Sequence, residues 1–101
     1  MRWLKGRGFE KLQSRRRFWG VEIDVIAYHP KARRWWLVEV KSVTNSNWIG
    51  HRWSLKQRLR LERVAQAWAE SHSAATQVVL ALVKGPQLEV HMLPMEDVAN
   101  S

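Results

Sequence analysis

Hydrophobic and polar positions follow a strand-like pattern between Val21 and Ser42, where two apolar stretches flank a short polar segment that contains a proline. Valine, isoleucine, tyrosine and tryptophan dominate both stretches, and the polar segment is His29–Arg34. Because β-branched and aromatic residues favour strands, the pattern predicts a hairpin of two strands. With the polar segment as its loop, Tyr28 pairs with Trp35, and the positions beyond them pair in order.

This register brings charged residues together within the apolar stretches. Asp24 falls opposite Glu39, and Glu22 falls opposite Lys41. Because side chains alternate along a strand, these four residues are expected to project from one face. The other face is wholly apolar, and its members are Val21, Ile23, Val25, Ala27, Trp36, Val38 and Val40.

Two carboxylates placed directly opposite each other repel and destabilise a pair of strands. A divalent cation between Asp24 and Glu39 would remove that cost. Neighbouring strands lie about 4.8 Å apart, and Mg²⁺ takes carboxylate oxygens at about 2.0–2.1 Å, so one ion can bridge both side chains. The alternative is that the acids lie on a solvated face and pair with some of the many arginines.

The remaining elements follow from similar patterns. Met1–Lys5 is expected to be the last turn of a helix, and Phe9–Trp19 an outer strand whose exposed basic residues protect a sheet edge. A helix is predicted from Leu55 to Glu70. The apolar run Gln77–Val83 predicts a strand that is covered on both faces, and Leu88–Met92 a further strand. The fold expected is a mixed α/β domain in which an antiparallel three-strand meander packs its apolar face against the helix.

The predicted helix has Ser54 as its N-cap. Its expected buried stripe consists of Leu55, Leu59, Leu61, Val64, Ala65 and Trp68. Its expected outward residues are Arg58, Arg63, Gln66 and Glu70.

Composition narrows the class of protein. The chain has 101 residues, which suit one small domain (1–101). Seventeen Lys and Arg against nine Asp and Glu give a formal net charge of +8, which indicates a polyanionic partner, with nucleic acid ahead of membrane. The chain has no cysteine, no apolar run long enough to span a membrane and no signal-peptide core, so a soluble cytoplasmic protein is expected.

The residues expected to contact nucleic acid lie in a basic run, a loop and the start of the helix. They are Arg15, Arg16, Arg17, Trp48, His51, Arg52, Lys56 and Arg60. The basic run is also explained by edge protection, and Lys56 by a solvated surface position. Trp19, Trp48 and Trp53 fall in turns or loops where a base could stack, although aromatic residues are more often used for packing.

The remaining tryptophans divide between packing and the charged face. Trp36 and Trp68 fit the core, and Trp35 is expected on the acidic face near the turn. The four histidines show no paired ligand spacing and give no zinc signal.

The spacing Asp24…Glu39-Val40-Lys41 on adjacent strands, followed by a helix, resembles the PD-(D/E)XK nuclease superfamily. The order GVEIDVIA, then WWLVEVKS, then a lysine in SLKQRLRLERVAQAW is similar to the YraN-like family of small bacterial proteins. It is also similar to archaeal-type Holliday junction resolvases. The likeness covers roughly residues 4–92.

This resemblance implies a restriction-endonuclease-like core and a metal-dependent endonuclease that acts on DNA, including branched DNA such as Holliday junctions. It implies that Asp24, Glu39 and the Val40 backbone carbonyl hold Mg²⁺ or Mn²⁺, and that Lys41 orients or activates water. The family's acidic segment and its helix-opening lysine correspond to two further catalytic candidates, which are Glu22 and Lys56.

The chain departs from the family pattern in two places. The family's first helix begins well upstream, so the N-terminal helix here is expected to be truncated, and Val21 separates Gly20 from the acidic segment. A truncated helix leaves apolar sheet surface, which leads us to expect a homodimer. The competing functions are a non-catalytic nucleic-acid-binding module on the same fold and a protein-interaction subunit.

Overall fold

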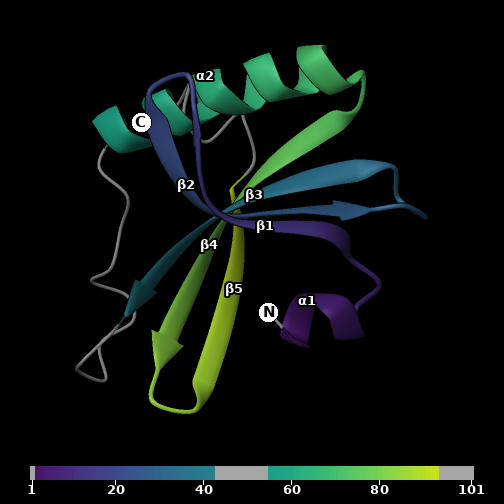
Figure 1. The fold of residues 1–101 in the computed structure, drawn as a ribbon. Coiled ribbons are helices and arrows are strands. Elements are labelled where there is room, and N and C mark those ends of the chain that lie inside the picture. The colour runs from purple at the N-terminus through teal and green to yellow at the C-terminus, as the bar shows by residue number, and fades with distance from the viewer. Residues whose placement is uncertain (1, 43–54, 94–101) are drawn as a thin grey trace.

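The computed structural model describes residues 2–42 and 55–93, which form a mixed α/β domain (Figure 1). Its described helices are α1 (Arg2–Gly6) and α2 (Leu55–His72). Its described strands are β1 (Glu10–Phe18), β2 (Val21–His29), β3 (Arg34–Ser42), β4 (Ala75–Lys84) and β5 (Gln87–Leu93). The five strands form one sheet in chain order. None of the described helices is long and apolar enough to cross a membrane.

The sheet begins with the predicted antiparallel meander of β1, β2 and β3. Tyr28 pairs with Trp35, which confirms the predicted register of the central hairpin. Strand β4 then runs parallel to β3, and β5 returns antiparallel to β4. Parallel neighbours need a crossover connection, and α2 lies in it. The prediction of β1 as an outer strand is confirmed, because β1 lies at one edge of the sheet.

The larger of the two hydrophobic clusters among the described residues lies between α2 and one face of the sheet. Its buried members are Ile23, Ile26, Trp35, Leu37, Leu61, Val64, Ala65, Trp68, Val78, Leu80 and Leu82. Trp68 is fully buried at its centre, with ring centroids 5.2 Å from Trp35 and 5.1 Å from Phe18. Trp35 therefore lies on the predicted face, but it is buried beneath α2.

Helix α2 does not cover the face that the sequence predicted. It packs on Ile26, Trp35 and Leu37, which share a face with Glu39 further along β3. The expectation that α2 packs on the wholly apolar face of Val38 is wrong. The face that carries the acids also carries these three large side chains, at the end of the strands near the β2–β3 turn. Burying a large apolar side chain is worth about 1.5–3 kcal/mol.

The buried stripe of α2 is confirmed at Leu61, Val64, Ala65 and Trp68. The predicted burial of Leu59 is wrong, because Leu59 is 40% exposed. The predicted outward position of Arg58 is also wrong, because Arg58 is half-buried. Position 58 precedes 61 and 65 at spacings of three and seven, so it shares their face, whereas position 59 is rotated by about 100°. Ser54 and the side chain of Leu55 lie outside the described residues.

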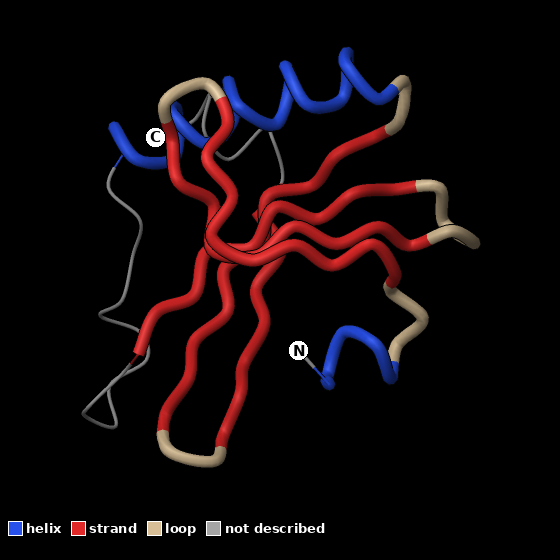
Figure 2. The backbone as a smooth tube through the Cα atoms, viewed as in Figure 1, coloured by secondary structure: helices blue, strands red, loops and turns tan. Residues whose placement is uncertain are grey.

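The β1–β2 hairpin is bent, and Figure 2 shows its tip curling toward α2. Ile23 belongs to the cluster beneath α2, whereas Val25 belongs to the cluster on the other face. The expectation that both share one face is therefore wrong, and half-buried Val21 also packs on the α2 side. Opposite Asp24, Arg15 adopts a left-handed conformation with φ 51°, which departs from the extended backbone of a regular strand.

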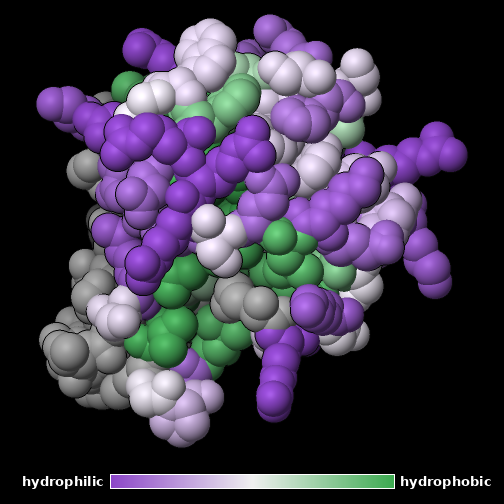
Figure 3. Space-filling model, in the orientation of Figure 1, coloured by the Kyte–Doolittle hydropathy of each residue, from purple (hydrophilic) through white to green (hydrophobic). Residues whose placement is uncertain are grey.

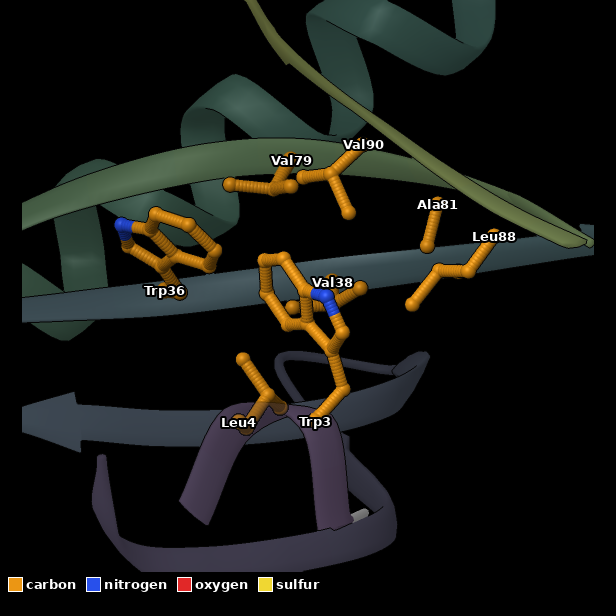
Figure 4. Close-up of a pocket in the computed structure, with 8 residues that line it drawn as sticks. All are labelled: Trp3, Leu4, Trp36, Val38, Val79, Ala81, Leu88 and Val90. Carbon is orange, nitrogen blue, oxygen red and sulfur yellow. The ribbon is translucent and has the colours of Figure 1, made fainter. Parts of the chain in front are cut away.

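The second cluster covers the opposite face of the sheet, where α1 packs. Its buried members are Leu4, Phe9, Val25, Ala27, Val38, Val79 and Ala81. Trp3 stacks on half-buried Trp36 with ring centroids 6.4 Å apart, and Figure 4 shows both around a small apolar cavity of about 10 Å³. The predicted helical turn at the start of the chain and the packing role of Trp36 are confirmed.

Candidate active site

The two central strands part at the predicted acidic positions. The ladder between β2 and β3 runs from the pair His29–Arg34 to the pair Val25–Val38. The expected pairs Asp24–Glu39 and Glu22–Lys41 are not part of this ladder. The β1–β2 hairpin bends at this point, since Ile23 and Val25 lie in clusters on opposite faces of the sheet. The carboxylate of Asp24 takes the place of a backbone partner, since its Oδ2 accepts the Val40 N–H at 2.8 Å.

Glu39 lies close to this carboxylate and is half-buried. Burial raises the pKa of Glu39 above its ordinary value of 4.5, and the negative charge of Asp24 raises it further. A hydrogen bond that protonated Glu39 donates to Asp24 acts in the same direction. The two carboxyl groups therefore meet, as the register predicted, and they disfavour carrying two charges at once.

Two other predicted residues act on the same pair. Lys41, half-buried on β3, lowers the pKa of Glu39 through its positive charge, whereas the exposed Glu22 raises it. No arginine is among the charged groups of the described residues that shift this pKa. The alternative interpretation, in which the acids lie on a solvated face and pair with arginines, therefore does not describe Glu39.

The donor set can be compared with the needs of a cation. No group of three or more His, Cys, Asp or Glu side chains within residues 2–42 and 55–93 is placed to hold a metal ion. Mg²⁺ commonly uses one or two carboxylates and completes its shell with waters and substrate phosphates. Asp24, Glu39 and the carbonyl of Val40 offer hard oxygen donors of this kind, so they fit Mg²⁺ or Mn²⁺ better than a softer metal.

Two further predicted residues lie on α2, apart from this carboxyl pair. Lys56 and Arg60 are exposed and line a groove with Trp19 of the β1–β2 turn. Neither is among the charged groups that act on Glu39. Arg63 also lines this groove. The features of the sequence that could have indicated this role are its positive charge and the Trp-Gly turn.

Three candidates from the loop before α2 lie outside the described residues, and they are Trp48, His51 and Arg52. The basic run is exposed on the edge strand β1. There the Arg16 guanidinium lies 5.5 Å from the centre of the Trp68 ring, and Arg17 donates a hydrogen bond to the Gly20 carbonyl at 3.4 Å. Figure 3 shows hydrophilic residues gathered over this hairpin, so the run is available to a partner while it also protects an edge.

Together these features define a class: a small mixed α/β protein that gathers two carboxyl groups and a lysine where two central strands part. The chain belongs to the uncharacterised protein family UPF0102, whose family model matches residues 1–89. This match confirms the resemblance to the YraN-like family, and the membership fits a nuclease-like protein. No curated protein matches the chain.

Proposed function

We propose that this protein is a divalent-metal-dependent endonuclease that hydrolyses phosphodiester bonds in DNA. The observation that carries the proposal is the meeting of Asp24 and Glu39, with Lys41 beside them, where β2 and β3 part. A structural role does not require two carboxyl groups to approach each other, because their repulsion weakens the sheet.

Each residue has a physical role in such a site. Asp24 is held in place by the Val40 N–H, so one carboxylate is oriented before any ligand arrives. Asp24, Glu39 and the Val40 carbonyl would hold Mg²⁺ or Mn²⁺, which lowers the pKa of bound water and neutralises charge on the phosphate. Because Glu39 must release its proton to bind a cation, metal affinity should rise with pH.

Lys41 supplies the positive charge of the site from the protein side. It lies two residues beyond Glu39 on β3, so both side chains leave the strand on the same face. A fixed ammonium beside the scissile phosphate stabilises the charge that develops in the transition state. Glu22, exposed on β2, is close enough to act electrostatically on Glu39 and is a further catalytic candidate.

The basic surface supports DNA as the substrate. The chain has a net charge of +8. Exposed cations lie in the Arg15–Arg17 run of β1 and at Lys56 and Arg60 of α2. Such charges bind the phosphate backbone without reading its sequence. The likeness to Holliday junction resolvases favours branched DNA, which is the substrate class that we propose.

A homodimer would suit a two-fold DNA junction. The cluster beneath α1 has half-buried members at its margin, which are Trp3, Leu12, Trp36, Val40, Leu88 and Val90. Figure 3 shows apolar residues at the surface of the sheet beside α1, which itself contributes only five residues. We propose that a second copy of the chain covers this surface, because burying it removes apolar area from water.

Cleavage of labelled linear, nicked and four-way DNA in Mg²⁺ and in Mn²⁺ tests the proposed activity. We expect wild-type protein to cut, Asp24→Asn to lose activity, and Lys41→Ala to lose about 10²–10³-fold in rate while still binding DNA. Glu10→Gln is the matched control, because it removes an exposed carboxylate at the start of β1 and should leave cleavage unchanged.

Gel shifts at two salt concentrations, with and without Mg²⁺, distinguish the competing functions. Salt-sensitive binding without any cleavage would support a non-catalytic nucleic-acid-binding module. The absence of binding at low salt would support a protein-interaction subunit. Cleavage by Asp24→Asn at the wild-type rate would contradict the assignment of the site.

A further inference from the structure

A groove of about 630 Å³ lies between the β1–β2 turn and the first half of α2. Its lining residues are Trp19, Gly20, Val21, Lys56, Leu59, Arg60, Arg63 and Val64. Three of these are cations and none is an acid. The groove therefore combines apolar walls with positive charge, which suits a ligand that carries both flat apolar groups and negative charge.

Trp19 is the unusual residue of this groove. Its side chain is 72% exposed, and its backbone is left-handed with φ 55°. It forms a two-residue turn with Gly20, closed by the pair Phe18–Val21. Asparagine or glycine is favoured at such a position, whereas a bulky residue there is strained. An exposed, strained tryptophan adds little to folding, and this points to a binding role.

The ring of Trp19 is supported from one side. Phe18 stacks against it with ring centroids 6.4 Å apart and an interplanar angle of 26°, and Phe18 in turn contacts buried Trp68. The tryptophan is thus backed by the core beneath α2 while most of its surface stays open to a ligand. Leu59, also exposed at 40%, adds apolar surface to the opposite wall.

We propose that this groove binds an unpaired segment of a DNA strand, with a base stacked on Trp19 and phosphates contacting Lys56, Arg60 and Arg63. Proteins that bind single strands pair a stacking aromatic with a basic groove in this way. Bases within a duplex are already stacked and cannot use the ring. Val21 lines the groove, and Asp24 lies three residues further along β2, about 10 Å away at about 3.3 Å per residue.

This inference rests on the proposed function, because it names the feature of the DNA that the nuclease site would meet. A strand held in the groove would need to extend only a few nucleotides to reach the carboxyl pair, since stacked bases rise about 3.4 Å each. Branched and flapped DNA present such unpaired segments beside duplex.

Fluorescence anisotropy in EDTA tests the groove without cleavage. The probes are a labelled single-stranded DNA, the same sequence as a duplex, and a strand of equal length and charge in which the bases are absent. For Trp19→Asn we expect the affinity for the single strand to fall about tenfold, or about 1.4 kcal/mol, and duplex affinity to stay within about twofold. Asparagine suits the left-handed turn, so the melting temperature should not fall.

Ser73→Asn is the matched control. Ser73 is also left-handed, with φ 50°, but it follows the far end of α2. Asparagine at this position should therefore leave the affinities for single-stranded and duplex DNA unchanged. Trp19→Phe should recover part of the affinity, because phenylalanine keeps a stacking face.

The result that overturns the proposal is a Trp19→Asn protein that binds the single strand as tightly as wild type. Should that variant not fold, the wild-type comparison decides, because equal affinity for the strand without bases excludes stacking. A Trp19-dependent preference for single-stranded RNA would overturn the assignment to DNA. Trp19-dependent binding by a protein that never cleaves would refute only the nuclease function, whereas cleavage with Trp19-independent binding would refute only the groove.

Discussion

Glu39→Gln tests the electrostatic cost of placing a charged Glu39 at this site. Glutamine keeps the shape of the side chain and removes a charge that burial disfavours and that Asp24 repels. Asp24→Asn is a less clean change, because Asp24 also accepts the Val40 N–H, and hydrogen bonds to charged groups are worth about 1.5–3 kcal/mol. Glu39→Gln should therefore stabilise the metal-free protein at neutral or higher pH.

The size of the effect follows from the surroundings of Glu39. Two unit charges roughly 4 Å apart repel by about 1 kcal/mol in bulk water and about 4 kcal/mol at an effective dielectric constant of 20. Glu39 is half-buried and Lys41 offsets part of the repulsion, so we expect a gain of about 1–2 kcal/mol. For a domain of this size, that corresponds to a rise in melting temperature of roughly 4–16 °C.

The effect should depend on pH in a definite direction. A carboxyl group with a raised pKa in the folded state binds its proton more tightly there than in the unfolded state, so folding stability falls as pH rises. Below the ordinary value of 4.5 both states are protonated and the penalty is absent. The penalty develops as pH rises through the raised pKa, so wild type and Glu39→Gln should differ at pH 8 and converge at pH 4.

Thermal melts in EDTA at both pH values measure this difference, with Glu10→Gln as an exposed control that should change stability by less than about 0.5 kcal/mol. Mg²⁺ at about a hundredfold excess over its dissociation constant should stabilise wild type by about 2.7 kcal/mol and Glu39→Gln much less. A Glu39→Gln protein that melts at or below wild type in EDTA at pH 8 would refute the argument. The carboxyl group would then have a structural role.

Two further predictions concern binding and assembly. Replacing Arg15–Arg17 with glutamine should reduce the slope of log affinity against log salt by about 0.9 for each phosphate that the protein no longer neutralises, as measured by anisotropy titrations on duplex DNA. An unchanged slope would place the DNA contacts on the exposed residues Arg60 and Arg63 of α2 instead. Light scattering at tens of micromolar protein should give the mass of a dimer, because half-buried apolar residues lie at the margin of the second cluster, and a monomer mass throughout would contradict the proposed assembly.

The elements and the pairing of the central hairpin follow from local features of the sequence. Alternation at period two and the proline-containing turn placed β2 and β3 in register, and Tyr28 opposite Trp35 anchored that register. The helical spacing placed α2 to within two residues of its observed end. The approach of the Asp24 and Glu39 side chains follows from the same register, although the two residues are not paired in the ladder itself.

The surfaces at which those elements pack depend on contacts between distant segments of the chain. Helix α2 covers the face that carries the acids, because burying Trp35 and Leu37 near the β2–β3 turn stabilises the fold by more than covering the acids costs. That free-energy balance includes contributions from segments far apart in the chain. The bend of the hairpin coincides with the left-handed backbone of Arg15, which the pattern of side chains does not encode. That bend parts the strands at Asp24 and carries Trp19 to α2, so the opening of the site and the groove beside it both depend on backbone geometry that hydrophobic periodicity cannot predict.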